Sequence, residues 1–125
     1  MSTALLSNYR QSPRKVRLFA DLVRGRRVAE ALPVLDAVEK RAAVPVKKLI
    51  LSATANAVHN HNAKKEDLFI VEIRVDESAT LKRWRARARG RAFPIRKRTS
   101  RVFVRLEEKA KPETNRKKVE KKAKK

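Results

Sequence analysis

The sequence has no cysteine, which excludes disulfide scaffolds, thiolate zinc sites and cysteine nucleophiles. It is also poor in acidic residues, with 13 against 34 basic ones, for a formal net charge of +21. No apolar run approaches the ~20 residues of a membrane span, and the first ten residues resemble no signal peptide. We therefore expect a soluble intracellular protein that binds a polyanion, and not a free-standing metabolic enzyme.

The positive charge is unevenly distributed along the chain. Residues 1–80 carry 14 basic and 9 acidic side chains, residues 81–101 carry 10 and none, and residues 109–125 carry 9 and 2. The apolar residues are concentrated in the remainder. We predict a single domain over residues 1–108, which includes an extended hairpin at about 76–101, followed by a flexible Lys-rich tail at 109–125.

Three segments show helical periodicity. The first starts at Ser12-Pro13, a favourable N-cap and first helical residue, and stops at Gly25; its apolar residues are Val16, Phe19, Ala20 and Val23. The second is shorter and contains Pro33, which should kink it or displace its start; its stripe is Val28, Ala31, Leu32, Leu35 and Val38. The third runs from about Arg41 to Asn60 with the stripe Ala42, Val46, Leu49, Ile50, Ala53 and Ala57.

Two later segments alternate with period two, as half-buried strands do. One would turn a single face towards the core, with the residues Phe69, Val71, Ile73 and Val75. The other would do so with Val102, Val104 and Leu106, and residues 4–9 could add a third strand. We predict an α+β fold in which three helices pack on a small three-stranded antiparallel sheet, with a long protruding β-hairpin.

The connection between these strands, residues 76–100, is either a disordered linker or a hairpin that continues them outward. If Val75 faces Val102, paired residue numbers sum to 177. Trp84 would then lie opposite Phe93, with the turn at Ala88-Arg89 beside Gly90. The two aromatic rings could pack on each other or stack on bases. Pro94 cannot donate a ladder hydrogen bond, so a bulge or bend near it is expected.

Arginine outnumbers lysine eight to two in residues 81–101. The planar guanidinium group binds phosphate in a bidentate manner and stacks on bases, so this composition favours close contact with a structured polyanion. Such a hairpin has no core of its own, and its positive charges repel one another. We expect its tip to become rigid only when an external polyanion is bound.

Several motifs in order along the chain carry a resemblance to a known family. They are Ser12-Pro13-Arg14-Lys15-Val16-Arg17, Asp21-Leu22-Val23-Arg24-Gly25, Lys47-Lys48, Ser52-Ala53-Thr54-Ala55-Asn56-Ala57, His59-Asn60, Gly90-Arg91-Ala92 and Ile95-Arg96-Lys97-Arg98-Thr99-Ser100. In this the chain strongly resembles the bacterial large-subunit ribosomal protein family twenty-two. It departs from the family at Arg101, where histidine is usual, at Phe93-Pro94, and in the tail.

The resemblance implies a structural constituent of the large ribosomal subunit, located in the cytoplasm. It would bind several domains of 23S rRNA, bridge them during assembly, and line the nascent-polypeptide exit tunnel with the hairpin. Neighbouring ribosomal proteins, including the other protein at the tunnel constriction, and the nascent chain would be its further partners. No cofactor, metal, small-molecule substrate, membrane or catalytic residue is expected.

The rRNA-binding residues that the resemblance implies fall into three groups. Those of the body are Arg14, Lys15, Arg17, Arg24, Arg26 and Arg27. Those of the hairpin are Lys82, Arg83, Trp84, Arg85, Arg87, Arg89, Gly90, Arg91, Arg96, Lys97, Arg98, Thr99, Ser100 and Arg101. A third group lies at the end of the long helix and comprises Asn56, His59 and Asn60, although Asn60 or Asn62 could equally be a helix C-cap.

The sequence also offers three alternatives to an rRNA-binding function. His59 and His61 with Glu66 or Asp67 could suggest a metal or acid–base site, but no organised third ligand accompanies the two histidines. A DNA-architectural protein with a β-arm in the minor groove is the main alternative, because Phe93 and Pro94 could form an apolar wedge. A membrane-surface role for the tail lacks an apolar face.

Overall fold

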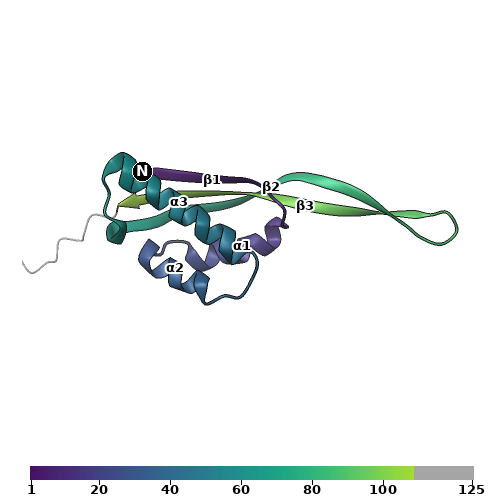
Figure 1. Cartoon of the computed structure of the whole chain (residues 1–125), viewed down its shortest axis with the longest axis horizontal. Helices are drawn as coiled ribbons and strands as arrows, with labels where there is room; N and C mark the ends of the chain where they lie inside the picture. The colour runs from purple at the N-terminus through teal and green to yellow at the C-terminus, as the bar shows by residue number, and fades with distance from the viewer. Residues whose placement is uncertain (109–125) are drawn as a thin grey trace, which may run out of the picture.

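The computed structural model of the protein describes residues 1–108, and the predicted Lys-rich tail lies outside this range. The elements are β1 (Ser2–Tyr9), α1 (Pro13–Val23), α2 (Val28–Asp36), α3 (Ala43–His61), the short 3-10 helix η1 (Lys65–Asp67), β2 (Leu68–Ala86) and β3 (Ala92–Glu108). The sheet has the order β1-β3-β2, with both strand pairs antiparallel. The three helices lie on one side of the sheet, and β2 and β3 continue well beyond them as a hairpin (Figure 1). The predicted α+β fold is confirmed.

Helix α1 begins and ends close to where the sequence predicts. Pro13 is its first residue, and the carbonyl oxygen of Ser12 accepts hydrogen bonds from the backbone N–H groups of Lys15 at 3.1 Å and Val16 at 3.3 Å. The Ser12 side chain makes no capping bond. After the C-cap Arg24, Gly25 has φ = +73°, a conformation that glycine adopts without strain.

Helix α2 starts at Val28, so Pro33 lies inside it and does not displace its start. A proline at this position removes the bond that its N–H would donate to the carbonyl of Ala29. The helix continues to Asp36, and the carbonyl of Pro33 still accepts the N–H of Ala37 at 3.0 Å. We attribute this tolerance to the burial of Val28, Ala31 and Leu35 on one side of the helix.

Helix α3 carries Pro45 in its first turn and ends in a left-handed residue, Asn62, with φ = +50°. The sequence allowed either Asn60 or Asn62 as the C-cap. The C-cap is Asn62, and Asn60 lies within the helix. The small residues Ala53 and Ala57 are buried, and the helix packs on β1. The Ser2 hydroxyl donates to the carbonyl of Ala53 at 3.0 Å, so the element that approaches this half of the helix is a strand.

The predicted buried face of β2 is partly wrong, because a β-bulge interrupts the alternation. Ile70 pairs with Leu106 and Glu72 with Arg105, which leaves Val71 as an extra residue. The strand therefore buries Ile70 before the bulge and Ile73 after it, while Val71 is exposed. A two-residue period read across the bulge assigns the wrong face to every residue before it.

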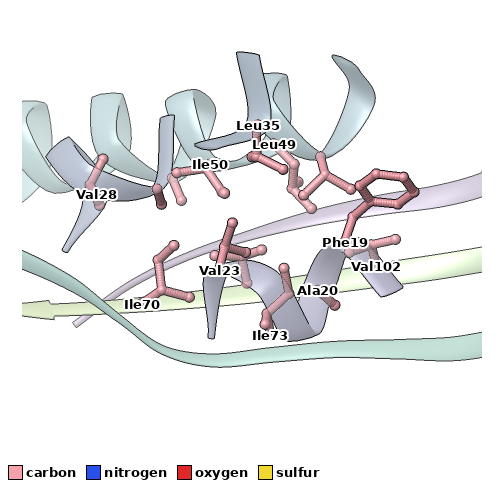
Figure 2. Packing of buried hydrophobic residues seen from close by; sticks show 14 of the residues in the cluster. Phe19, Ala20, Val23, Val28, Leu35, Leu49, Ile50, Ile70, Ile73 and Val102 are labelled. Atoms are coloured by element: carbon pink, nitrogen blue, oxygen red, sulfur yellow. The ribbon is translucent and has the colours of Figure 1, made fainter. Parts of the chain in front are cut away.

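The core lies between the helices and the covered face of the sheet. Side chains from all three helices and from β2 and β3 meet there (Figure 2), and Ile50, Ile70, Ile73 and Val102 are at most 2% exposed. Nothing of this core extends into the hairpin, where every residue from 82 to 98 is exposed. We call residues 1–78 and 99–108 the body, and residues 79–98 the hairpin.

Candidate nucleic-acid interface

The hairpin presents nine basic and no acidic side chains to solvent. Within the described residues, no ion pair involves any of them. Arg83 Nη1 donates a local hydrogen bond to the carbonyl of Lys82 at 2.7 Å. The predicted hairpin is present, and its positive charges have no counterions among residues 1–108.

The tip of the hairpin is a tight turn at Arg89 and Gly90, one residue later than predicted. Both residues have positive φ, +61° and +66°, as type I′ turns require. The N–H of Arg91 donates to the carbonyl of Ala88 at 3.5 Å, and that of Arg87 donates to the carbonyl of Arg91 at 2.8 Å. Gly90 fixes the position of this turn because a side chain there would be strained.

The predicted pairing of Trp84 with Phe93 is wrong. Trp84 lies opposite Pro94 and Arg85 opposite Phe93, because a second bulge in β2 shifts the register by one residue. The guanidinium carbon of Arg87 lies 5.2 Å from the centre of the Phe93 ring. Trp84 is 69% exposed and Phe93 55% exposed, so both rings keep accessible surface for stacking.

Of the bulge or bend expected near Pro94, the bulge is absent, since pairing is continuous from Leu81–Lys97 to Ala86–Ala92. The reason lies in the hydrogen-bonding pattern of antiparallel strands, in which alternate residues turn their N–H groups away from the partner. Arg87 and Arg91 are a hydrogen-bonded pair. Pro94, three residues beyond Arg91, occupies a position whose nitrogen points outward, so the ladder loses no bond there.

The bulge in the hairpin lies instead at Ala79 and Thr80, which together oppose Arg98. The Thr99 hydroxyl donates to the carbonyl of Ala79 at 2.6 Å. Thr99 is 5% exposed and Ser100 is fully buried, whereas Arg101 is exposed. Thr99, Ser100 and Arg101 were all predicted to contact RNA, but of these three only Arg101 is accessible. The Thr99 hydroxyl instead stabilises the bulge.

Helix α1 and the turn after it present the predicted basic residues of the body. The side chains of all six are exposed, but three of them also contact the body. Arg17 Nε donates to the carbonyl of Val75 at 3.2 Å, and Arg24 Nη2 donates to that of Ile73 at 3.1 Å. The Arg27 guanidinium carbon lies 5.2 Å from the centre of the Phe69 ring. These three arginines therefore hold α1 and the following turn against β2.

A hollow at the base of the hairpin gathers basic side chains from separate parts of the chain. Its cations are Arg10, Lys15, Arg41, Arg96 and Arg98, and no acidic residue lines it. None of the five takes part in the ion pairs of the described residues. Sequence reasoning missed Arg10 and Arg41, because only the fold brings them next to Arg96 and Arg98. We call this site the basal hollow.

Tyr9 lies next to the basal hollow. Its hydroxyl donates to Gln11 Oε1 at 2.6 Å and lies 3.4 Å from the carbonyl of Arg41. Burial raises the pKa of the Tyr9 phenol above its usual value near 10, although the positive charge of Arg41 opposes the shift. The phenol therefore stays neutral at physiological pH and adds no negative charge to the hollow.

The uncovered face of the sheet carries two arginines with internal partners. Arg74 lies 3.1 Å from Asp76 and 3.6 Å from Glu72, and its guanidinium carbon lies 5.4 Å from the Phe103 ring centre. Arg105 lies 3.6 Å from both Glu72 and Glu107. The charges of Arg74 and Arg105 are thus compensated within the body, whereas Arg101 on the same face takes part in none of the ion pairs of the described residues.

The third predicted group does not join the basal hollow. The Asn56 side-chain amide donates to the carbonyl of Thr3 at 3.1 Å, so it links α3 to β1. His59 Nδ1 lies 3.4 Å from Asn60 Oδ1, and both side chains are exposed near the end of α3. Within residues 1–108, no three His, Asp or Glu side chains gather in a way that could hold a metal ion. No helix in this range has the length and apolarity needed to cross a membrane.

A compact body with an exposed arginine-rich ribbon, which has no acidic partner within residues 1–108, is typical of proteins that bind nucleic acid. Residues 4–107 match the family model for ribosomal protein L22p/L17e. The chain therefore belongs to this family, and the resemblance inferred from the sequence motifs is confirmed.

Curated relatives match over most of their own length. The large ribosomal subunit protein uL22 of Lactobacillus helveticus is 50% identical over 100 residues, which are 80% of this chain and 86% of the relative. That of Rubrobacter xylanophilus is 50% identical over 103 residues, or 82% and 81% of the two chains. The Mesoplasma florum protein is 52% identical over 101 residues, or 81% and 90%.

Proposed function

We propose that this protein is a structural constituent of the large ribosomal subunit that binds 23S rRNA in the cytoplasm. One observation carries the proposal: nine basic side chains project from the body on a hairpin without any acidic partner in the described residues. Placing so many like charges on a thin ribbon is unfavourable unless an external polyanion neutralises them. Membership in a ribosomal protein family supports rRNA as that polyanion.

The proposed interface has two parts that are far enough apart to contact different rRNA segments. The basal hollow lies where the body meets the hairpin. Each arm of the hairpin then continues for about ten residues, which span roughly 33 Å at 3.3 Å per residue. By holding distant phosphate backbones against one protein, the chain would lower their mutual repulsion and bridge rRNA domains during assembly.

The family resemblance extends this proposal to the nascent-polypeptide exit tunnel. In that arrangement the hairpin lines the tunnel, contacts the nascent chain, and meets a neighbouring ribosomal protein at the constriction. The length and thinness of the hairpin support a position deep in RNA, because its residues need no protein core around them. The role is architectural and involves no catalytic residue.

Salt-dependent binding of the full chain to a 23S rRNA transcript tests the proposal. With about eight phosphates neutralised, log K should fall with log salt at a slope of roughly −6 to −7. A variant in which Asn-Gly replaces residues 79–98 closes the hairpin directly at Ser78 and Thr99, which already pair in the sheet. It should keep the thermal unfolding of the body and lose most of the slope.

Two outcomes would contradict the proposal. One is a slope near −1 for the full chain, because such a chain would not be an electrostatic clamp. The other is displacement of the rRNA transcript by duplex DNA at equal phosphate concentration, which would favour a DNA-architectural protein instead. Cosedimentation with large subunits in high-salt sucrose gradients tests the location of the protein independently of both.

A further inference from the structure

The two parts of the β2–β3 ladder pair in different registers. In the body, Val75 faces Val102 and Ser78 faces Thr99, so that paired residue numbers sum to 177. Beyond the bulge, Leu81 faces Lys97 and all pairs out to the tip sum to 178. The bulge at Ala79 and Thr80 supplies the one extra residue that lets both registers coexist.

The register of the hairpin decides which side chains share a face, because directly opposed residues point to the same side and neighbours along a strand alternate. One face, called here the cationic face, carries Arg83, Arg85, Arg87, Arg91 and Lys97. The opposite face carries two cations, Lys82 and Arg96, among the uncharged residues Trp84, Ala86, Ala92 and Pro94. The contact between Arg87 and Phe93 agrees with this assignment, since both belong to the cationic face.

The same sequence in the register of the body would distribute its charge almost evenly. If the pairs of the hairpin also summed to 177, Lys82 would share a face with Arg91 and Lys97. The other face would carry Arg83, Arg85, Arg87 and Arg96. In the register of the body the two faces of the hairpin would carry three and four cations. In the observed register they carry five and two, although the net charge is the same.

Two local features fix the observed register. The three-residue loop 88–90 sets the pairing from the tip, since the N–H of Arg87 donates to the carbonyl of Arg91 and both Arg89 and Gly90 have the positive φ of the turn. At the other end, the Thr99 hydroxyl donates to the carbonyl of Ala79, which satisfies a backbone group of the bulge. The mismatch between the tip register and the body register is thus accommodated at one defined place.

We infer that the Arg89–Gly90 turn and the bulge at Ala79 and Thr80 sort the cations of the hairpin onto one face, and that this face binds an RNA phosphate backbone. The inference rests on the proposed function, which it refines by naming the surface. Five cations on one side of a ribbon can contact consecutive phosphates of one strand together, whereas cations divided between two sides cannot. The opposite face, with Trp84 and Pro94, would face away from that backbone.

The test moves the turn without changing the charge. The variant A88N/R89G/G90R places Asn-Gly, the sequence most favourable for a type I′ turn, at positions 88–89, and so favours pairs that sum to 177. The matched control keeps the natural loop Ala88-Arg89-Gly90, which the Arg87–Arg91 hydrogen bond closes, and so keeps pairs that sum to 178. The variant and the control have the same net charge of +21.

Engineered cysteine pairs report the register directly, because the natural chain has no cysteine. In the control, W84C/P94C should oxidise to a disulfide and W84C/F93C should not, since cysteines on opposite faces cannot be bridged. In the turn-shifted variant the two results should exchange. If the turn-shifted variant still formed the disulfide of the control, the turn would not set the register and the inference would be overturned.

Binding to a 23S rRNA transcript then tests the surface itself. We expect the turn-shifted variant to bind roughly fivefold more weakly than the control at physiological salt, with a salt slope less steep by about one. Equal affinity and slope, after a confirmed change of register, would overturn the inference and leave the proposed function intact. If the natural chain did not bind the transcript at all, the proposed function itself would be contradicted.

Discussion

The body and the hairpin are built from the same two strands but are held in opposite ways. In the body, β2 and β3 bury Ile73 and Val102 under the helices, and Arg74 and Arg105 on the uncovered face have carboxylate partners. In the hairpin, every residue from 82 to 98 is exposed, and no basic side chain has an acidic partner within the described residues. The body is thus stabilised from within, whereas the charges of the hairpin are left without partners in residues 1–108.

This difference separates residues that fold the protein from residues that bind. A cation with an internal carboxylate contributes to the body and offers little free charge to RNA. A cation of the hairpin has no such partner in the described residues, and its charge remains available for phosphate. The comparison therefore predicts which substitutions change stability and which change affinity.

The largest predicted effect is on the core. Ile50 is fully buried, and replacing it with alanine should lower the free energy of unfolding by about 2–5 kcal/mol, because the cavity cannot close completely. Replacing Trp84 with alanine removes a larger side chain that is 69% exposed, and should change that free energy by less than about 0.5 kcal/mol. Denaturant unfolding of both variants measures the contrast.

Equal destabilisation by the two substitutions would break the comparison, because the hairpin would then share the core of the body. RNA affinity supplies the second readout, with the opposite ranking. Loss of Trp84 should weaken binding to the rRNA transcript if bases stack on its ring, by an amount on the order of 1–3 kcal/mol per base. The Ile50 variant, while folded, should bind normally.

The second prediction concerns the basal hollow. The double variant R10Q/R41Q removes two cations that only the fold brings beside Arg96 and Arg98. RNA affinity should fall roughly twentyfold at physiological salt, with a slope less steep by about two. The control K64Q/K65Q removes the same charge beyond the far end of α3, roughly 28 Å away along that 19-residue helix. Equal losses in the two variants would show that net charge alone matters.

Much of the body could be predicted from the sequence because local signals and burial agree there. Pro13 and Gly25 mark the ends of α1, and the apolar stripe between them is the face that is buried. The basal hollow could not be predicted, since Arg10 and Arg41 lie in unrelated segments and meet Arg96 only in three dimensions. Sequence patterns find a charged segment more readily than a charged site.

The errors in the sheet have one physical cause, which is the bulge. Each bulge adds a residue that no periodic pattern reveals, so Val71 was assigned to the wrong face and Trp84 to the wrong partner. The glycine alone could not give the register of the hairpin, because a two-residue type I′ turn at Arg89 and Gly90 would place Ala88 opposite Arg91, and such pairs sum to 179. The pairs sum to 178 because Arg87 bonds to Arg91 and leaves Ala88 as an extra residue at the tip.

The third prediction tests what holds the second bulge. Thr99→Val keeps the shape of the buried side chain but removes the hydroxyl that donates to the carbonyl of Ala79. The free energy of unfolding should fall by about 0.5–1.5 kcal/mol, because a part-buried hydrogen bond is lost. Thr99→Ser, which keeps the hydroxyl, is the matched control and should recover most of the loss. If both variants lost the same amount, packing of the methyl group would explain the effect.

The smallest predicted effects compare two arginines of the same sheet, one with carboxylate partners inside the described part of the chain and one without. Arg74 has two carboxylate partners and an aromatic ring, whereas Arg85 has no ion pair within the described residues. Arg74→Gln should cost about 0.5–1 kcal/mol of stability with unchanged RNA affinity. Arg85→Gln should leave stability unchanged within about 0.5 kcal/mol and weaken RNA binding roughly fivefold.

Each variant of this pair is the control for the other, since both remove one guanidinium group from the same sheet. Thermal unfolding and rRNA binding should therefore rank the two variants in opposite orders. The two variants lose the same charge and differ only in the surroundings of that charge. Because salt screens exposed charges, a higher salt concentration should reduce the difference in RNA affinity between them. If Arg74→Gln weakened RNA binding as much as Arg85→Gln does, internal carboxylates would not withdraw a cation from the interface, and the separation of folding residues from binding residues would fail.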